Sequence, residues 1–588
     1  MSVMVERNMR NYRLNRELEA MEQARIFNKA FLIEKKYCEE HIRDIIETFN
    51  ECMAAASVDK AKYKYCFDAI GIPTDYKPNA KSKSFYNKTV RKEVNRYASK
   101  YIDNVFPEGG HNFTITAKDE CVDLFASFYN GMPREEVQNL LNSFLQILTD
   151  TYHEEIENSN FYQLFLEFIK ESSVRQGNLL IQPADRLLKN SNIAFEQILP
   201  FSIAHDYNQQ KDVVGVYRTL KIRVNDIEKT FPDYDSAALK DKKPRQFLTL
   251  KECCFIKYIP LLREYRWVYL LIDETSAIRL IRLLEINPFI TVCETLSTGS
   301  NVGHGKTFDC YKDILTAEED TETVRKIVHA IQEPPFEALK DVLNEPSLRQ
   351  EKVIKPGMLI PVKQMGSIRP ILMGQHPEAV ISLAQSSEQN IANSISGDIL
   401  TTDPQATATL TTVQMAQIAN FIAALQGKMV KPLVFQLVSK VAFFCRKNGT
   451  SAQKLKRFLL EDAENRLPSE IFTNAVKLDP ELYEDTLDWF IETLLNSFGS
   501  FSLVNINILS KIGMRKKLDD MNTLISGLQA ITQLTGMPTN AFISEDKLVS
   551  FIREAMGLEH SVFLSIEEKE EKLQRMAEAQ QAAQQQAA

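Results

Sequence analysis

Helical and strand-like spacings of apolar residues follow one another between residues 291 and 449, and this stretch organises the chain. Over residues 306–332 apolar residues recur at mixed steps of three and four, which predicts a helix. These positions are Phe308, Tyr311, Ile314, Leu315, Val324, Ile327, Val328 and Ile331. Pro334 and Pro335 end this helix, because proline lacks an amide donor and disfavours a helical residue before it.

A strand-like insert and a second helix follow the first helix. Short apolar pieces separated by turn-forming residues predict a β-rich insert over residues 334–372. Pro377 falls in the first turn of a second helix that is predicted to reach Ile395. Residues 396–412 then form a loop rich in Ser and Thr, and a long helix is predicted from residue 413 to about residue 445.

The part of the chain before residue 291 has a mixed pattern. Residues 1–56 are predicted to be helical, with an apolar stripe among many charges. This segment is either an outward arm for a neighbouring subunit or an amphipathic helix on the body of the protein. Two further amphipathic helices are predicted over 137–152 and 161–175, and Gly177 is expected to end the second. Alternating apolar residues predict strands over 111–116, 178–182, 198–203, 213–219, 254–260 and 265–272.

The chain after the long helix is predicted to be mainly helical. Short helices are expected over residues 450–500, a strand over 504–509 and further helices from residue 513 onwards. Ser565 begins a capping-box sequence ahead of the last helix. Residues 577–588 are Ala and Gln except for Glu578, and this end is either part of a helical barrel or a frayed tail.

The order of these elements resembles the portal (head-to-tail connector) protein of short-tailed bacteriophages (podoviruses), over roughly residues 90–535. The residues that carry the resemblance are Pro288-Phe289-Ile290 ahead of residues 303–313, Pro334-Pro335, Lys355-Pro356-Gly357, the loop 396–412, Ala98-Ser99-Lys100 before Val105-Phe106-Pro107, and Gly177-Asn178-Leu179-Leu180. Their order and spacing make the resemblance.

The resemblance implies an α+β, mostly helical subunit of the portal type. By this resemblance the chain divides into an N-terminal helical extension (1–90), an α+β wing (91–303), a first stem helix (304–333), a β-rich clip (334–372), a second stem helix (373–395), a tunnel loop (396–412), a long helix crossing the wing (413–449), a crown (450–540), and a C-terminal helix or barrel with a low-complexity tail (541–588). The extension has no counterpart in the family pattern, so its role stays open.

The resemblance also implies partners. Subunits are expected to form a ring, dodecameric in the family, at one vertex of the capsid. The ring is the channel through which double-stranded DNA is packaged and ejected. It docks the terminase motor and later the tail adaptor, and it meets capsid and scaffolding proteins. The protein is therefore expected in the virion, and in the host cytoplasm during assembly.

Two sets of residues are candidates for these contacts. The tunnel-loop candidates for DNA contact are Ser396, Asp398, Thr401, Thr402, Asp403, Gln405 and Thr407. Their hydroxyl and amide groups can hydrogen-bond to phosphates, while the aspartates oppose tight binding; the same loop can also be a flexible surface linker. The clip candidates are Lys352, Lys355, Lys363 and Arg369. These cations serve either docking to an acidic surface of the motor or adaptor, or solubility.

Composition narrows the function classes. The 588 residues are 44% hydrophobic and 25% charged, which is enough apolar material for a sizeable core. A formal net charge of −8 argues against a protein whose main task is to grip nucleic acid, although DNA can slide through a channel of this charge. The nine cysteines are scattered except for Cys253-Cys254, which predicts reduced thiols. No metal or cofactor is expected, and no apolar run reaches the roughly 18 residues of a membrane span.

Residues 300–307 nearly match the phosphate-binding loop GxxxxGK[ST]. They follow an apolar run and precede a helix, and Asp273-Glu274 end another apolar run, as does the magnesium-holding strand of such ATPases. However, Ser300 replaces the first glycine, the acidic pair precedes the loop, and no βαβ alternation follows. We therefore expect no enzyme activity. The alternatives are a nucleotide-hydrolysing motor subunit and a different structural protein with a helical-hairpin core.

Overall fold

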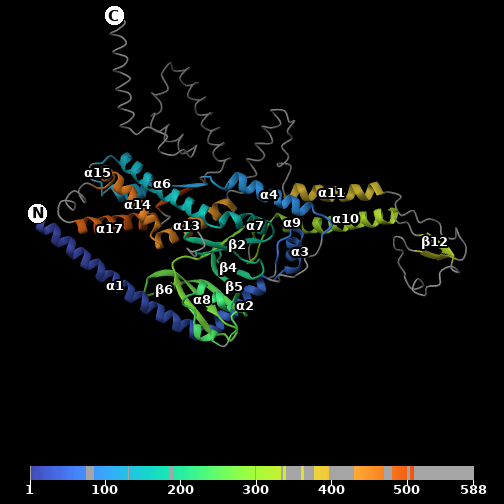
Figure 1. Ribbon diagram of the computed structural model, residues 1–588, viewed down its shortest axis with the longest axis horizontal. Helices are drawn as coiled ribbons and strands as arrows, with labels where there is room; N and C mark the ends of the chain where they lie inside the picture. Colours follow the sequence, from blue (N-terminus) through green and yellow to red (C-terminus); the bar gives the residue numbers. More distant parts are fainter. Residues whose placement is uncertain are drawn as a thin grey trace, which may run out of the picture. The chain divides into compact units, whose positions relative to one another are not determined.

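The computed structural model describes residues 2–508 except for residues 75–84, 111, 127, 130–131, 185–190, 241, 298–299, 333–335, 340–358, 363–376, 396–428, 469–479 and 500–502. The chain forms two compact units, each assembled from distant stretches of sequence. The first comprises Met1–Tyr101, Asn160–Ala184 and Ile193–Gln436, and the second comprises Ile102–Ser159, Asp185–Asn192 and Leu437–Ala588. Helices predominate over strands, so the fold is the mostly helical α+β fold that was predicted (Figure 1).

The largest sheet of the first unit is an antiparallel meander in the order β4-β5-β6-β7-β8. Its strands are β4 (Ile203–Tyr207), β5 (Val213–Arg223), β6 (Phe247–Ile259), β7 (Glu264–Ile272) and β8 (Ile278–Leu284). Every second residue of β6 from Leu248 to Cys254 except Glu252 enters one apolar core, which explains the alternating sequence there. Between β5 and β6, α8 (Val224–Thr230) and the 3₁₀ turn η1 (Ser236–Leu239) cover this core with Ile227 and Leu239.

A second antiparallel sheet has the order β3-β2-β9. Its strands are β2 (Gln176–Pro183), β3 (Ile193–Gln197) and β9 (Phe289–Cys293), and α7 (Phe161–Val174) packs on β2. Gly177 lies inside β2 and does not end the helix, contrary to our expectation. A Cβ atom at Gly177 would lie 2.7 Å from the carbonyl oxygen of Phe168, so this glycine allows the helix and the strand to approach.

The strand predicted over residues 198–203 is wrong. Residues 198–202 connect β3 to β4 as a turn, in which the Ser202 N–H donates to the Leu199 carbonyl at 3.0 Å. Pro200 cannot donate to a strand ladder, which favours the turn. The other predicted strands are present, although β5 and β6 are longer than expected and the pattern missed β3, β4 and β8.

The helices of the first unit include an N-terminal group and a pair. The N-terminal helices are α1 (Ser2–Glu40), α2 (Ile42–Ala55), α3 (Lys60–Ile70) and α4 (Thr89–Val105), so the predicted helix over 1–56 is present with a break at His41. After the short α9 (Lys306–Asp309), helices α10 (Tyr311–Gln332) and α11 (Pro377–Ile395) lie side by side (Figure 1). Both are found where the apolar spacing predicts them. Between them in the chain, β12 (Phe336–Leu339) and β13 (Leu359–Val362) form a parallel pair.

The second unit consists mainly of helices. They are α5 (Asp119–Ala126), α6 (Arg134–Asn158), α14 (Thr450–Glu461), α15 (Ala463–Arg466), α17 (Pro480–Gly499) and most of α13 (Lys431–Lys447). Strand β1 (Phe113–Ala117) pairs antiparallel with β14 (Val504–Ile508), so the two predicted strands are present and form one ribbon. The helices predicted beyond residue 508 lie outside the described residues.

Two class predictions can be compared with the fold. All nine cysteines have free thiols, and all except the half-buried Cys293 are buried. In the part of the chain that the structure describes, no helix has both the length and the apolar character needed to cross a membrane.

Candidate functional site: the junction at the start of the paired helices

Helix α10 begins, and its partner α11 ends, beside a tightly packed turn over residues 303–307, which we call the junction loop. Strand β11 (Gly303–His304) pairs with β10 (Thr295–Leu296), and α9 follows directly. Gly305 has φ −124° and ψ 177°, which any residue can adopt, so its role is steric. A Cβ atom there would lie 2.3 Å from the carbonyl oxygen of Ser173. The buried Thr307 hydroxyl meets the Ser173 hydroxyl at 3.0 Å, so the loop fits closely against the end of α7.

Backbone amides of the junction loop are used by groups of the protein itself. The N–H of Gly303 donates to the Gln176 side chain at 3.1 Å, and the N–H of Gly305 donates to the last carbonyl of α7 at 3.3 Å. The N–H of Lys306 donates to the Glu294 carboxylate at 2.8 Å. In a phosphate-binding loop such amides point at the phosphates. Here a carboxylate takes that place, so the near match to GxxxxGK[ST] forms a structural turn.

Glu294 joins the junction loop to α4. Its carboxylate is only 8% exposed and accepts a hydrogen bond from the Tyr97 hydroxyl at 2.6 Å. Burial raises the pKa of Glu294, against the opposing effects of the Tyr97 and Lys306 hydrogen bonds. The Tyr97 hydroxyl also lies 3.9 Å from the sulfur of Met429, near the start of α13. One buried carboxylate therefore connects segments that are far apart in sequence.

Asn87 clamps the start of α4 onto both paired helices. Its side-chain amide nitrogen lies 3.0 Å from the Thr321 hydroxyl of α10 and 3.0 Å from the Glu388 carboxylate of α11. Its backbone N–H donates to the Glu318 carboxylate at 2.9 Å, and the N–H of Tyr86 donates to the same carboxylate at 3.0 Å. The middle turns of the two helices are thus fixed to one short segment of chain.

A buried polar network supports the sheet beneath the junction loop. His205 is fully buried; its Nε2 lies 2.9 Å from the Thr291 hydroxyl and its Nδ1 faces the Gln176 side-chain amide. Burial, and then the nearby Arg175 cation, lower the pKa of His205 to about 3, so the ring is neutral at pH 7. Gln436 of α13 bonds to both backbone groups of Thr291, at 3.1 and 3.0 Å, and so continues the hydrogen bonding of β9.

Asp273 follows the strand that resembles the magnesium-holding strand of an ATPase, but its carboxylate stabilises a hairpin turn. Asp273, between β7 and β8, accepts hydrogen bonds from the backbone N–H groups of Thr275 and Ala277 and from the Arg279 side chain at 2.7 Å. Burial alone would raise the pKa of Asp273, but these hydrogen bonds hold it below its usual value. Within the described residues no cluster of three or more His, Cys, Asp or Glu is suited to a metal ion.

The candidate contact residues chosen from sequence lie outside the described residues. This holds for the tunnel-loop set, Ser396, Asp398, Thr401, Thr402, Asp403, Gln405 and Thr407, and for the clip set, Lys352, Lys355, Lys363 and Arg369. The structure does describe the ends from which the loop departs. Ile395 and Met429 are both fully buried, and the Cys310 thiol at the start of α10 hydrogen-bonds to Ser394 near the end of α11.

Comparison with known proteins gives one family. The model of the bacteriophage head to tail connecting protein matches residues 71–441, which is more than half of the chain. The search of curated proteins gives no match. The family match spans both sheets of the first unit, the junction loop and the paired helices. The chain therefore belongs to the bacteriophage head-to-tail connecting protein family.

Proposed function

We propose that the chain is the portal subunit of a phage, and that copies of it form a dodecameric ring at one capsid vertex. The family match supports a structural part of the virion that joins head to tail. The observation that carries the finer proposal is the anchored pair α10–α11. The buried contact of Thr307 with Ser173 fixes the junction loop at the base of this pair, and partly buried hydrogen bonds of Asn87 hold both helices further along, as a stem beside moving DNA requires.

Helix lengths support a tunnel loop near the base of the stem. At 1.5 Å per residue, the 22 residues of α10 span about 33 Å and the 19 residues of α11 span about 29 Å. The contact between Cys310 and Ser394 brings the end of α11 back to the start of α10. Ile395, the last described residue before 396–412, therefore lies at the level of the junction loop and not at the far end of the stem. We propose that they project into the channel and touch passing DNA, and that residues 334–372 form the clip that docks the terminase and the tail adaptor.

The proposed ring can be tested directly. Negative-stain electron microscopy of the purified protein is expected to show closed rings with a central hole. Particles without a hole at all protein concentrations, or rings that assemble only with nucleotide, would contradict the portal assignment.

The tunnel loop has its own test. Deleting residues 401–408 is expected to leave expression and ring formation near normal, because the segment is polar and removes little apolar surface. Packaging assays should then show impaired DNA retention or a failed last stage of packaging. Normal retention by intact rings of the deletion variant would rule out the loop as a DNA contact.

A further inference from the structure

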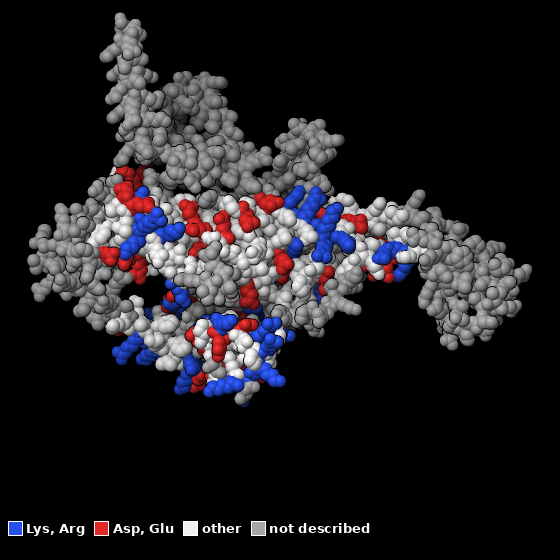
Figure 2. Space-filling model, viewed as in Figure 1, with Lys and Arg blue, Asp and Glu red and all other residues white. Residues whose placement is uncertain are grey.

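The outward face of α4 and the residue before it is strongly basic. The cations are Lys88, Arg91, Lys92, Arg96 and Lys100, which we call the basic face. At 100° per residue they share one side of the helix, and the opposite side carries the buried Val90, Val94 and Tyr97. Glu93, the carboxylate in this stretch, is only 5% exposed. Figure 2 shows Lys and Arg gathered over this part of the surface, at the position of α4 in Figure 1.

The cations of the basic face lie close enough to repel one another. Burial, and then the neighbouring Arg96, lower the pKa of Lys100. Burial also lowers the pKa of Lys170 on α7, to which the Arg91 cation contributes while Glu167 opposes the shift. Among the described residues, Lys88, Arg91 and Lys92 form no ion pair. Arg96 has a carboxylate partner in Glu93, at 3.9 Å. The face therefore keeps an excess of positive charge at Lys88, Arg91 and Lys92, which favours an external anion.

Neutral donors complete the surface around these cations. Asn95 and Ser99 lie on the same side of α4 as the cations, and both can donate hydrogen bonds to phosphate oxygens. Beside Lys88, the Arg325 guanidinium stacks at 4.1 Å from the ring centroid of Tyr86. None of the large exposed apolar side chains among the described residues lies on α4. Protein interfaces are rich in aromatic residues and poor in lysine at their centre, so this surface suits a nucleic acid better than a protein.

We propose that the basic face binds the phosphate backbone of double-stranded DNA without reading its sequence. The proposal rests on the portal function, which brings DNA to this protein and leaves its binding surface open. The face extends about 18 Å from Lys88 to Lys100, enough to follow several phosphates, since B-DNA carries one charge per roughly 1.7 Å. Because the chain as a whole has a net charge of −8, binding is weak and dependent on salt. Weak contact of this kind keeps DNA at the surface and still allows it to move along the protein.

Fluorescence anisotropy with a labelled 30-base-pair duplex tests this proposal across KCl concentrations. The variant Lys88→Gln/Lys92→Gln removes two exposed cations and leaves the buried side of α4 unchanged. Each lost phosphate contact lowers the slope of log K against log[KCl] by about 0.9. The double variant should therefore bind more weakly at 50 mM KCl, with a slope lower by roughly two for each subunit that touches the duplex.

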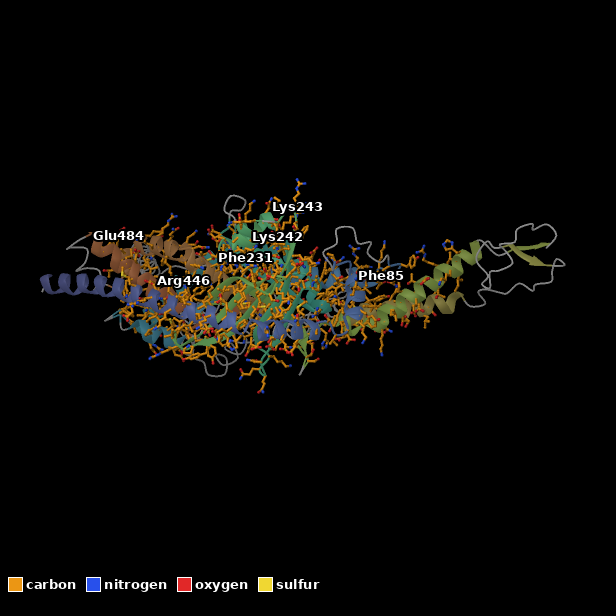
Figure 3. All side chains as sticks on the ribbon, turned by 90° about the horizontal axis from the view of Figure 1, so that it is seen from below. Phe85, Phe231, Lys242, Lys243, Arg446 and Glu484 are labelled. Carbon is orange, nitrogen blue, oxygen red and sulfur yellow. The ribbon has the colours of Figure 1, made fainter. Side chains whose placement is uncertain are left out.

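A matched control uses another basic site of the same unit. Lys242 and Lys243, labelled in Figure 3, lie between η1 and β6; Lys242 is half-buried and Lys243 is exposed. Lys242→Gln/Lys243→Gln makes the same change in charge and should keep the affinity and salt slope of the original protein. Equal losses in both double variants would overturn the proposal.

Imaging the same preparations separates the two proposals. Intact rings that bind no duplex at 50 mM KCl would overturn DNA binding at the basic face and leave the portal function standing. Absence of rings would refute the portal function. Binding that depends on Lys88 and Lys92 would support the basic face in either case.

Discussion

Replacing Gly305 by alanine tests whether the junction loop holds the paired helices in place. The new Cβ atom would lie 2.3 Å from the Ser173 carbonyl oxygen and 2.5 Å from the Ser172 carbonyl oxygen. A relaxed carbon–oxygen contact is about 3.3 Å or longer, so the backbone of α7 or of the loop must move by roughly 1 Å. Overpacking of this kind destabilises proteins by about 1–3 kcal/mol, and rigid backbone atoms place Gly305→Ala near the upper end.

The assay is thermal unfolding by calorimetry. At roughly 2 °C per kcal/mol for a unit of this size, Gly305→Ala should lower the Tm by about 6 °C. Gly449→Ala is the comparison for a Cβ atom without steric contact, because nothing lies within 4 Å of its added Cβ. Its φ of +75° leaves only the cost of placing alanine in the left-handed backbone region. That effect amounts to about 1–2 kcal/mol for an alanine in the left-handed region. A Gly305→Ala protein that melts within 1 °C of the original would refute the close packing of the junction loop.

Three other predictions follow from the site. Unfolded His205 takes up a proton below pH 6.5, whereas the folded ring does so only near pH 3, so the free energy of unfolding should fall by about 2 kcal/mol from pH 7 to pH 5. The fall should be smaller in His205→Gln, and equal pH dependence of the two proteins in calorimetry would contradict this. Phosphate release from ATP should stay at background for both the original protein and Lys306→Ala, and lysine-dependent turnover would overturn the structural role of the junction loop. Charge reversal at Lys352, Lys355 and Lys363 should leave rings intact and weaken terminase or adaptor binding in pull-downs at low salt; unchanged binding would remove these residues from the interface.

Local signals were enough to predict the paired helices. Pro334 marks the end of one and Pro377 begins the other, and the apolar spacing before Pro334 and after Pro377 indicates the helical period. The wrong strand over residues 198–203 shows the limit of such signals. Its alternating apolar residues include Phe201, which packs against Arg175 and Phe67 from a turn, and burial in a turn leaves the same pattern as burial in a strand.

The junction itself had little signal in the sequence. Glu294 and Asn87 act through partners that are distant in sequence, Tyr97 and Lys306 for the former and Glu318 and Glu388 for the latter. A single carboxylate or amide carries no periodicity, so only the fold reveals that it is buried and paired. The near phosphate-binding loop could be questioned from sequence, because Ser300 breaks the motif, and the structure adds that its amides bond to groups of the protein itself.

The ribbon formed by β1 and β14 has a consequence for how the protein is made. Thr116 and Asn507, which hydrogen-bond across it, are 391 residues apart. At 5–20 residues per second the ribosome needs roughly 20–80 s to make the partner strand after the first has emerged. During that time β1 has no partner along its edge, and an unpaired edge invites pairing with another chain. Premature termination ahead of residue 504 should therefore yield aggregated fragments, and slow translation of the intervening segment should lower the yield of folded protein.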